Sequence, residues 1–350
     1  MKLFHRITLF FTLLFITVIF LSCNSVTEPD ESAAGNLFVL NGLGEQVSLI
    51  NIDTEQVTNG FVDARDVPAD IAIHGENLLV LNSTPASLDV YNLVDRSAVK
   101  SLNLPTGSNP YAMLISNDRI FISGLVSNRI YVIDASGNYT LTDSVDVGIA
   151  PEGMAMDLDY LYVACTGGWF NSYDPSTLYV INPETLSPVD TIETGINPQR
   201  MAWSSDGRLH VVCTGNYADV SGSVSVIDPA DMTVETTIQT GGAPGHIEIT
   251  SDDVAYLSDF GVVTSETDST GYLYSYDALS YTVQYDNDDP ILVGYGAGGM
   301  EYDAQGDRLF IANFGIDAVQ QFNPDDNSVS ATYEVGDGPQ NLVYRVPVSN

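Results

Sequence analysis

The chain has 350 residues, and 44% of them are hydrophobic, enough to bury a large core. Its 46 acidic and 11 basic residues give a net charge of −35. A field of that sign repels phosphate backbones and anionic lipid head groups, so nucleic acid is not expected as a partner.

The N-terminal segment has the pattern of a secretory leader. A short basic start precedes an almost wholly apolar run from Ile7 to Ser22, which is short for a membrane span of ~20 residues. The run ends in Phe-Leu-Ser-Cys, which resembles a bacterial lipoprotein signal. The resemblance implies a signal peptide over residues 1–22 and a lipid on Cys23, which would hold the protein at the outer membrane or cell surface. An uncleaved anchor helix is the alternative.

Residues 23–35 are predicted to be the lipidated cysteine and a flexible tether, because they are polar and lack an apolar period. Residues 36–350 carry a repeat of roughly 40 residues, which predicts one domain rather than two. Each repeat contains four short segments rich in β-branched residues, separated by turn residues, and no segment shows a helical period. Four strands in roughly 40 residues are typical of a propeller blade.

Two landmarks fix the register of the repeat. A turn, usually ending in proline, precedes each expected inner strand, and the third strand of each repeat ends in Asp or Asn. The turns end at Pro68, Pro110, Pro151, Pro198, Pro244, Ala297 and Pro339. The Asp/Asn column comprises Asp53, Asn92, Asp134, Asn182, Asp228, Asp277 and Asn323. We interpret this column as turn caps rather than as catalytic acids, because such side chains bind nearby backbone amides.

The repeat resembles the YVTN-type (YncE-like) β-propeller repeat, as in GINPQRMAWSSDGRLHVVCTGN and GSVSVIDPADMTVETTIQTG of the fifth blade. The resemblance implies an all-β fold, a seven-bladed β-propeller of four-stranded antiparallel blades. The chain enters at a second strand, 37–41, and ends with an inner strand, 339–346. Pairing these two strands would complete blade one and close the ring, which removes exposed sheet edges.

Two cysteines remain in the propeller. Cys165 and Cys213 occupy equivalent positions in successive repeats, so their side chains should point the same way rather than toward each other. We expect buried free thiols, although the compartment would permit a disulfide.

Three consecutive blades, four to six, have long loops between their second and third strands: 166–177, 214–222 and 260–272. Long loops with aromatic residues on a rigid scaffold are a common place for ligand binding. The alternative is that these aromatics only pack on one another. The loops carry Trp169, Phe170, Tyr173, Tyr217 and Phe260.

Polar residues after each turn should rim the central channel on the same face. They are Asp70, Tyr111, Glu152, Gln199, Arg200, His246, Gln340 and Asn341. Arg200 and His246 could receive a carboxylate or another anion, and together with Glu152 they would suit a hydrolase or lyase. Besides anion binding and catalysis, a third interpretation is that these residues form an ordinary solvated rim without a ligand.

The sequence contains no convincing cofactor or metal motif. The GxGxxG match at 294–299 leads into an expected strand instead of a helix, and the calcium-like loop at 266–277 lacks two of the usual ligands. The sequence therefore favours a binding or scaffold module without a cofactor. Its ligand, a protein, peptide or glycan, is expected to dock on the long-loop face. A hydrolase or lyase at the channel mouth is the alternative.

Overall fold

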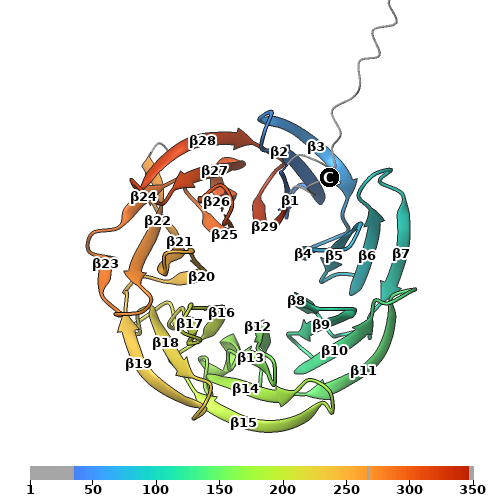
Figure 1. The fold of residues 1–350 in the computed structure, drawn as a ribbon, viewed down its shortest axis with the longest axis horizontal. Helices are drawn as coiled ribbons and strands as arrows, with labels where there is room; N and C mark the ends of the chain where they lie inside the picture. Colours follow the sequence, from blue (N-terminus) through green and yellow to red (C-terminus); the bar gives the residue numbers. More distant parts are fainter. Residues whose placement is uncertain (1–34, 266–267, 347–350) are drawn as a thin grey trace, which may run out of the picture.

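The computed structural model describes residues 35–346, apart from 266–267. These residues form a ring of seven antiparallel sheets around a central channel (Figure 1). The fold is therefore the seven-bladed β-propeller that the repeat predicts. The predicted signal peptide, Cys23 and the predicted tether up to residue 34 lie outside the described residues.

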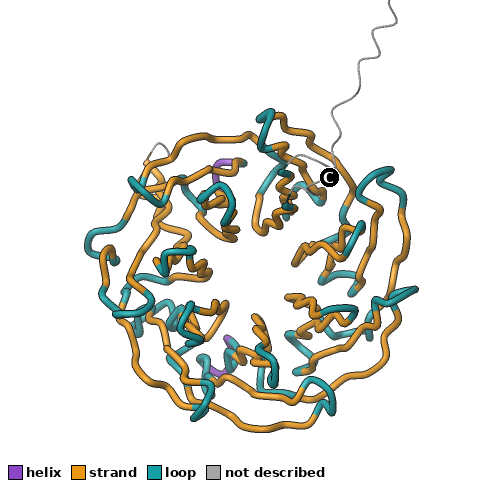
Figure 2. The backbone as a smooth tube through the Cα atoms, viewed as in Figure 1, coloured by secondary structure: helices purple, strands orange, loops and turns teal. Residues whose placement is uncertain are grey.

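Each blade contributes strands from the channel outward in the same order (Figure 2). The inner strands are β4 (Pro68–His74), β8 (Pro110–Ser116), β12 (Pro151–Met156), β16 (Pro198–Trp203), β20 (Pro244–Ile249), β25 (Ala297–Asp303) and β29 (Pro339–Arg345). The second strands are β1 (Asn36–Asn41), β5 (Asn77–Asn82), β9 (Arg119–Gly124), β13 (Leu161–Cys165), β17 (Leu209–Cys213), β21 (Val254–Ser265) and β26 (Arg308–Asn313). The third strands are β2 (Gln46–Asn51), β6 (Ser87–Asn92), β10 (Arg129–Asp134), β14 (Thr177–Asn182), β18 (Ser223–Asp228), β22 (Asp268–Asp277) and β27 (Ala318–Asn323). The outer strands are β3 (Gln56–Asp63), β7 (Ala98–Asn103), β11 (Thr140–Asp146), β15 (Ser187–Glu193), β19 (Thr233–Gln239), β23 (Val283–Tyr285) and β28 (Ser328–Glu334).

The core lies between blades rather than at the centre of the ring. Second strands such as LYVAC at 161–165 are buried along their whole length, because both of their faces pack against a neighbouring blade. The buried apolar residues form seven separate clusters, one at each junction between adjacent blades. This arrangement leaves the channel free for polar side chains.

The turn landmark begins every inner strand, as predicted. At six of the seven turns the residue just before the landmark has a left-handed backbone: Val67, Asn109, Ala150, Asn197, Gly296 and Gly338. A proline disfavours the α region for the residue before it, and its own fixed φ suits the first residue of a strand. The repeated turn therefore places the same short segment at the channel rim in successive blades.

The Asp/Asn column has the capping role that we expected. In blade 4, for example, Asn182 accepts hydrogen bonds from the backbone amides of Glu184 and Thr185, at 3.0 and 2.9 Å. One position needs correction: in blade 1 the cap is Asn51, which accepts the amide of Thr54 at 2.9 Å, and not Asp53. The third strand there ends two residues earlier than the sequence pattern suggested.

Blade 1 is closed by the two ends of the propeller. Strand β29 pairs antiparallel with β1, with Phe38 opposite Val343 and Leu40 opposite Asn341. The closure continues beyond the strands, where the amide of Gly42 donates to the carbonyl of Gly338 at 2.7 Å. The predicted ring closure is thus confirmed.

Blade 6 departs from the prediction of a long loop at 260–272. Strands β21 and β22 instead extend as a β-hairpin into this range, with Val262 opposite Thr270. A fifth strand, β24 (Ile291–Val293), pairs with β22 beyond the short β23.

Helical structure in the described residues is limited to two 3₁₀ turns, Trp169–Asn171 and Phe314–Ile316. No helix among residues 35–346, with 266–267 set aside, is long and apolar enough to cross a membrane. Cys165 and Cys213 are buried free thiols, as expected, and no disulfide joins them.

Candidate functional site

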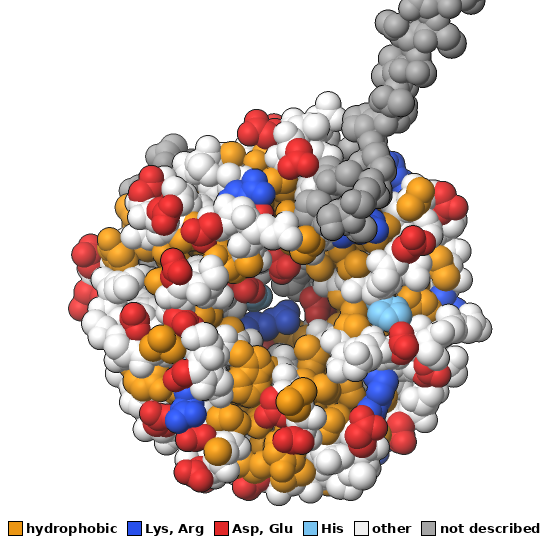
Figure 3. All heavy atoms as spheres, in the orientation of Figure 1, with side chains coloured by type: hydrophobic (Ala, Val, Ile, Leu, Met, Phe, Trp, Pro, Cys, Tyr) orange, Lys and Arg blue, Asp and Glu red, His pale blue; other side chains and the backbone are white. Residues whose placement is uncertain are grey.

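One end of the channel opens into a cavity of about 620 Å³, which we call the mouth cavity. Its wall consists of the first residues of the inner strands of blades 1, 2, 3, 5, 6 and 7, together with the start of the blade 6 hairpin. The space-filling view shows basic atoms within the central opening, with acidic atoms beside them (Figure 3). Arg200, which the repeated turn places at the rim, lines this cavity.

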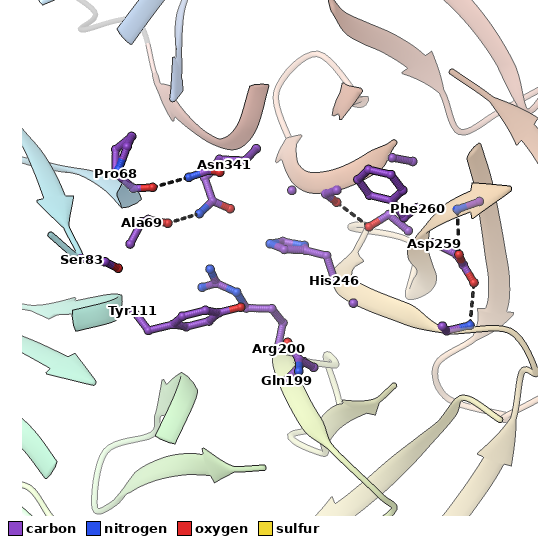
Figure 4. A pocket seen from close by; sticks show the side chains of 18 of the residues that line it. Pro68, Ala69, Ser83, Tyr111, Gln199, Arg200, His246, Asp259, Phe260 and Asn341 are labelled. Carbon is purple, nitrogen blue, oxygen red and sulfur yellow. Dashed lines mark hydrogen bonds between the residues drawn. The ribbon is translucent and has the colours of Figure 1, made fainter. Parts of the chain in front are cut away.

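Arg200 is the basic residue of the mouth cavity. Its side chain lies beside Tyr111 and points to the same space as His246 (Figure 4). Among the described residues, no carboxylate lies within 4.0 Å of its guanidinium, and the group makes no hydrogen bond. A guanidinium offers five donors in a planar fork, so Arg200 presents an unused anion-binding group.

Four carboxyl groups face the same channel, and burial is the main cause of their altered acidity. Burial raises the pKa of Asp70, that of Glu152 to about 7 and that of Glu301 to about 7. Burial, with the charge of Glu301, also raises the pKa of Glu248 well above its usual range. The positive charge of Arg200 opposes the shift at three of them, Asp70, Glu152 and Glu248. The channel therefore holds protons near neutral pH that exposed carboxylates would release.

His246 lies across the mouth cavity from Tyr111 (Figure 4). Burial, assisted by the charge of Arg200, lowers the pKa of His246 to about 3. Its Nδ1 has no hydrogen-bond partner among the described residues. The imidazole is consequently neutral at physiological pH, where it can donate or accept a hydrogen bond but is a poor proton acceptor.

A second cavity of about 570 Å³ adjoins the first, and we call it the aromatic cavity. It lies between blades 3, 4 and 5, and Tyr111, Gln199 and Tyr217 line both cavities. Five aromatic rings and the carboxyl of Glu152 form much of its wall. The rings are those of Tyr111, Trp169, Phe170, Tyr173 and Tyr217.

Four of these rings, all except that of Tyr111, lie on two loops that are fixed by their own hydrogen bonds. In the loop 166–176 the amide of Tyr173 donates to the carbonyl of Gly168 at 3.0 Å. In the loop 214–222 the side-chain oxygen of Asn216 accepts three backbone amides, at 2.9 to 3.1 Å. Tyr173 and Tyr217 both have left-handed backbones, with φ of 61° and 56°. Such backbones are uncommon in large residues and tend to occur at binding sites.

The aromatic residues combine mutual packing with exposure. Tyr173 is buried against Trp169 and Tyr217, with ring centroids 6.1 and 6.2 Å apart. Trp169, however, remains 68% exposed and Phe170 99% exposed, which exceeds what packing alone would leave open. The structure therefore supports both interpretations in part: Tyr173 is a packing residue, and Trp169 and Phe170 form a free rim.

The structure brings most of the predicted site residues together in these two cavities. Arg200, His246 and Phe260 line the mouth cavity, Glu152, Trp169, Phe170 and Tyr173 line the aromatic cavity, and Tyr217 lines both. Phe260 stands apart from the other aromatic residues, packing instead on Tyr295 and Phe314 with centroids 5.2 and 5.9 Å away. Of the expected rim residues, Tyr111, Gln199, Gln340 and Asn341 also line the mouth cavity.

Sequence reasoning missed Glu248 and Glu301, which lie deeper in the channel. Glu248 lies two residues after His246 and Glu301 two residues after Gly299 on their inner strands. Because alternate residues of a strand point to the same side, the strand pattern could have predicted that both acids face the channel. Within the part of the chain that the structure describes, no three His, Cys, Asp or Glu side chains group in a way that could hold a metal ion.

No protein-family model matches the chain, and no curated protein matches it. Solved structures match it over most of its length, but at low sequence identity. Hydrazine synthase from Kuenenia stuttgartiensis is 17% identical with a TM-score of 0.67, and the match covers 80% of this chain and 92% of that one. A putative 6-phosphogluconolactonase from Bacteroides fragilis is 14% identical with a TM-score of 0.68, with coverage of 91% and 99%. A protein from Lactobacillus plantarum is also 14% identical with a TM-score of 0.68, with coverage of 89% and 99%. At such identities the likeness establishes the seven-bladed propeller fold alone, which hosts unrelated activities.

Proposed function

We propose that this chain is an extracytoplasmic binding protein whose ligand docks on the face that carries the long loops of blades 4 to 6. The observation that supports this most is the unused guanidinium of Arg200 in a cavity that continues into a second, aromatic one. The ligand, a protein, a peptide or a glycan, would place an acidic group on Arg200 and apolar surface against the exposed Trp169 and Phe170.

The proposal includes the membrane attachment and the finer family. A lipid on Cys23 would hold the propeller at the outer membrane or cell surface, and the repeat would place it among YVTN-type propellers. Metabolic labelling with a fatty acid tests the first part. We expect label in the wild type and none in Cys23→Ala, and an unlabelled wild type would refute the anchor.

The docking face is tested by matched surface variants. Phe170→Ala and Arg200→Gln are compared with Leu158→Ala, because Leu158 is 100% exposed and lies in the turn at the opposite ends of β12 and β13. Binding is measured against glycan and peptide arrays and cell-surface fractions, with thermal unfolding as the folding control. We expect Phe170→Ala and Arg200→Gln to reduce binding and Leu158→Ala to leave it unchanged. The reverse pattern would place the ligand on the other face.

A second function, hydrolysis or elimination at the channel mouth, is favoured by one observation. Glu152, with its pKa raised to about 7, lies close enough to Arg200 for their charges to interact, as an acid–base group next to an electrostatic one would. His246 fits less well, because its pKa of about 3 makes it a weak base. Turnover that is lost in Glu152→Gln while ligand binding persists would favour the enzyme over the binder.

A further inference from the structure

The aromatic cavity combines apolar walls with one buried acid. Glu152 is only 9% exposed, and its Oε2 has no hydrogen-bond partner among the described residues. The hydroxyl of Tyr111 and the side-chain amide of Gln199 lie near the carboxyl group and favour its charged form. A buried carboxylate oxygen without a partner costs free energy, and that cost is removed only when something binds it.

The tyrosines around this acid lie close enough to interact with it. The negative charge of Glu152 raises the pKa of Tyr111, and it contributes to the raised pKa values of Tyr173 and Tyr217, where burial is the larger cause. The acid and the rings therefore belong to one site. Arg200 interacts with Glu152 through space but forms no ion pair with it, so the carboxylate lacks a bonded cation.

The chemistry of the wall selects among ligands. A neutral apolar ligand would leave the carboxylate buried and unpaired, and an anion would be repelled by it. A metal ion would find one carboxyl group and aromatic rings, whereas hard cations need several oxygen ligands. An organic ammonium group satisfies both parts of the wall, because its charge pairs with the carboxylate and its carbon-bound surface packs on aromatic faces. The net charge of −35 also draws cations toward the protein.

We propose that the aromatic cavity binds an organic ammonium group, with Glu152 as its counter-ion and Trp169, Tyr173 and Tyr217 as its aromatic walls. This inference rests on the proposed binding function and names the ligand class for one part of that site. Since Tyr111, Gln199 and Tyr217 line both cavities, a carboxylate on the same ligand can reach Arg200. A small zwitterion therefore engages the two cavities at once.

The first test compares choline with 3,3-dimethylbutan-1-ol, its uncharged carbon isostere, by calorimetry on the full propeller. We expect choline to bind at least about 10-fold more tightly than the isostere. Equal binding of the two, or no binding of choline, would overturn the proposal. The zwitterion 4-(trimethylammonio)butanoate should bind more tightly than choline in the wild type, and lose that advantage in Arg200→Gln.

Variants separate this inference from the proposed function. Glu152→Gln keeps the size of the side chain and one acceptor oxygen, so it should fold, and we expect about a 10-fold loss of choline affinity. The side chain of Tyr217 is 61% exposed, so Tyr217→Leu should reduce choline affinity several-fold without lowering the melting temperature. Because the charge of Arg200 favours the ionised form of Glu152, Arg200→Gln is measured at about pH 9, where Glu152 is ionised. Under this condition the variant should not weaken choline binding, although it should reduce capture of acidic ligands. Loss of choline binding in Arg200→Gln but not in Glu152→Gln would refute the assignment.

The pH dependence gives an independent readout. The groups that face Glu152 are the guanidinium of Arg200 and three tyrosines, whose raised pKa values keep them neutral. Choline affinity should therefore rise as the pH increases from about 5.5 to about 8, through the pKa of Glu152 near 7, and this rise should disappear in Glu152→Gln. A wild-type affinity that falls over this range would contradict the role of Glu152.

Discussion

The carboxylate of Asp70, on the inner strand of blade 2, accepts a hydrogen bond of 2.7 Å from the backbone amide of Met113 in blade 3. The same carboxylate accepts a hydrogen bond of 3.3 Å from the side-chain amide Nδ2 of Asn341 in blade 1. Asp70 thus connects three consecutive blades at the channel wall. It is 7% exposed, so these bonds are protected from competing water.

We predict that Asp70→Ala lowers the free energy of unfolding by about 2 kcal/mol, because the two donors from blades 1 and 3 and the backbone amide of Ile71 lose their acceptor. Asp70→Asn serves as the control, since its side-chain oxygen can still accept some of these amides. Urea unfolding should rank the proteins as wild type, Asn and Ala in order of decreasing stability. An alanine variant as stable as the wild type would show that the bridge is energetically neutral.

Ring closure predicts a global effect of removing one strand. Deleting residues 339–350 removes β29, the inner strand of blade 1, and exposes the hydrogen-bonding edge of β1. We expect a loss of several kcal/mol and a broad, non-cooperative thermal transition, because both neighbouring blades lose a contact surface. A truncated protein that melts like the full chain would contradict the closure.

The left-handed turn at Val67 predicts a stabilising substitution. Val67 has φ of 50°, is 59% exposed and is β-branched, so its backbone is strained. Val67→Gly should raise the free energy of unfolding by up to about 1 kcal/mol, since relief of the strain exceeds the added chain entropy. Val94→Gly is the matched control at an exposed valine that lacks a positive φ, and it should lower stability. A drop in melting temperature for both variants would refute the strain at Val67.

The channel carboxyls predict how stability depends on pH. Burial raises the pKa of Glu301 from 4.5 to about 7, so the folded state holds its proton longer than the unfolded state does. The stability linked to this proton is present below about pH 4.5 and is lost as the pH rises through about 7. Glu301→Gln keeps the acceptor for the amide of Tyr344, which Oε1 binds at 3.1 Å. We expect the variant to be about 1–3 kcal/mol more stable than wild type near pH 8 and similar to it near pH 4, by calorimetry. A variant that is less stable at both pH values would rule out this linkage.

The repeat alone predicted the architecture because a propeller repeats its local chemistry. The turn before Pro198 and the cap at Asn182 depend on neighbours within a few residues, so their sequence pattern specifies their geometry. The pairing of β1 with β29 was also predictable, since the first repeat begins at a second strand without an inner partner and the last segment is an inner strand without successors. The blade 6 hairpin was missed because its extended ribbon has no repeat counterpart.

The candidate site was only partly predictable, since it depends on distances between blades. The sequence placed Arg200 and His246 on one rim, but it could not show that Arg200 lacks an ion pair or that Glu152 faces the aromatic loops. Those features arise where three blades meet, and no local pattern encodes them. Burial, which changes the acidity of Glu152 and His246, is likewise a property of the assembled ring.

The seven apolar clusters lie between the sheets, whereas the loops 166–176 and 214–222 extend beyond them. Recognition and folding are thereby assigned to different parts of the same repeat. Loops of other length and composition can be grafted onto β13–β14 and β17–β18 without repacking a single cluster, so the scaffold can acquire new ligands one blade at a time. Such a ring is a suitable starting point for selecting binders from loop libraries.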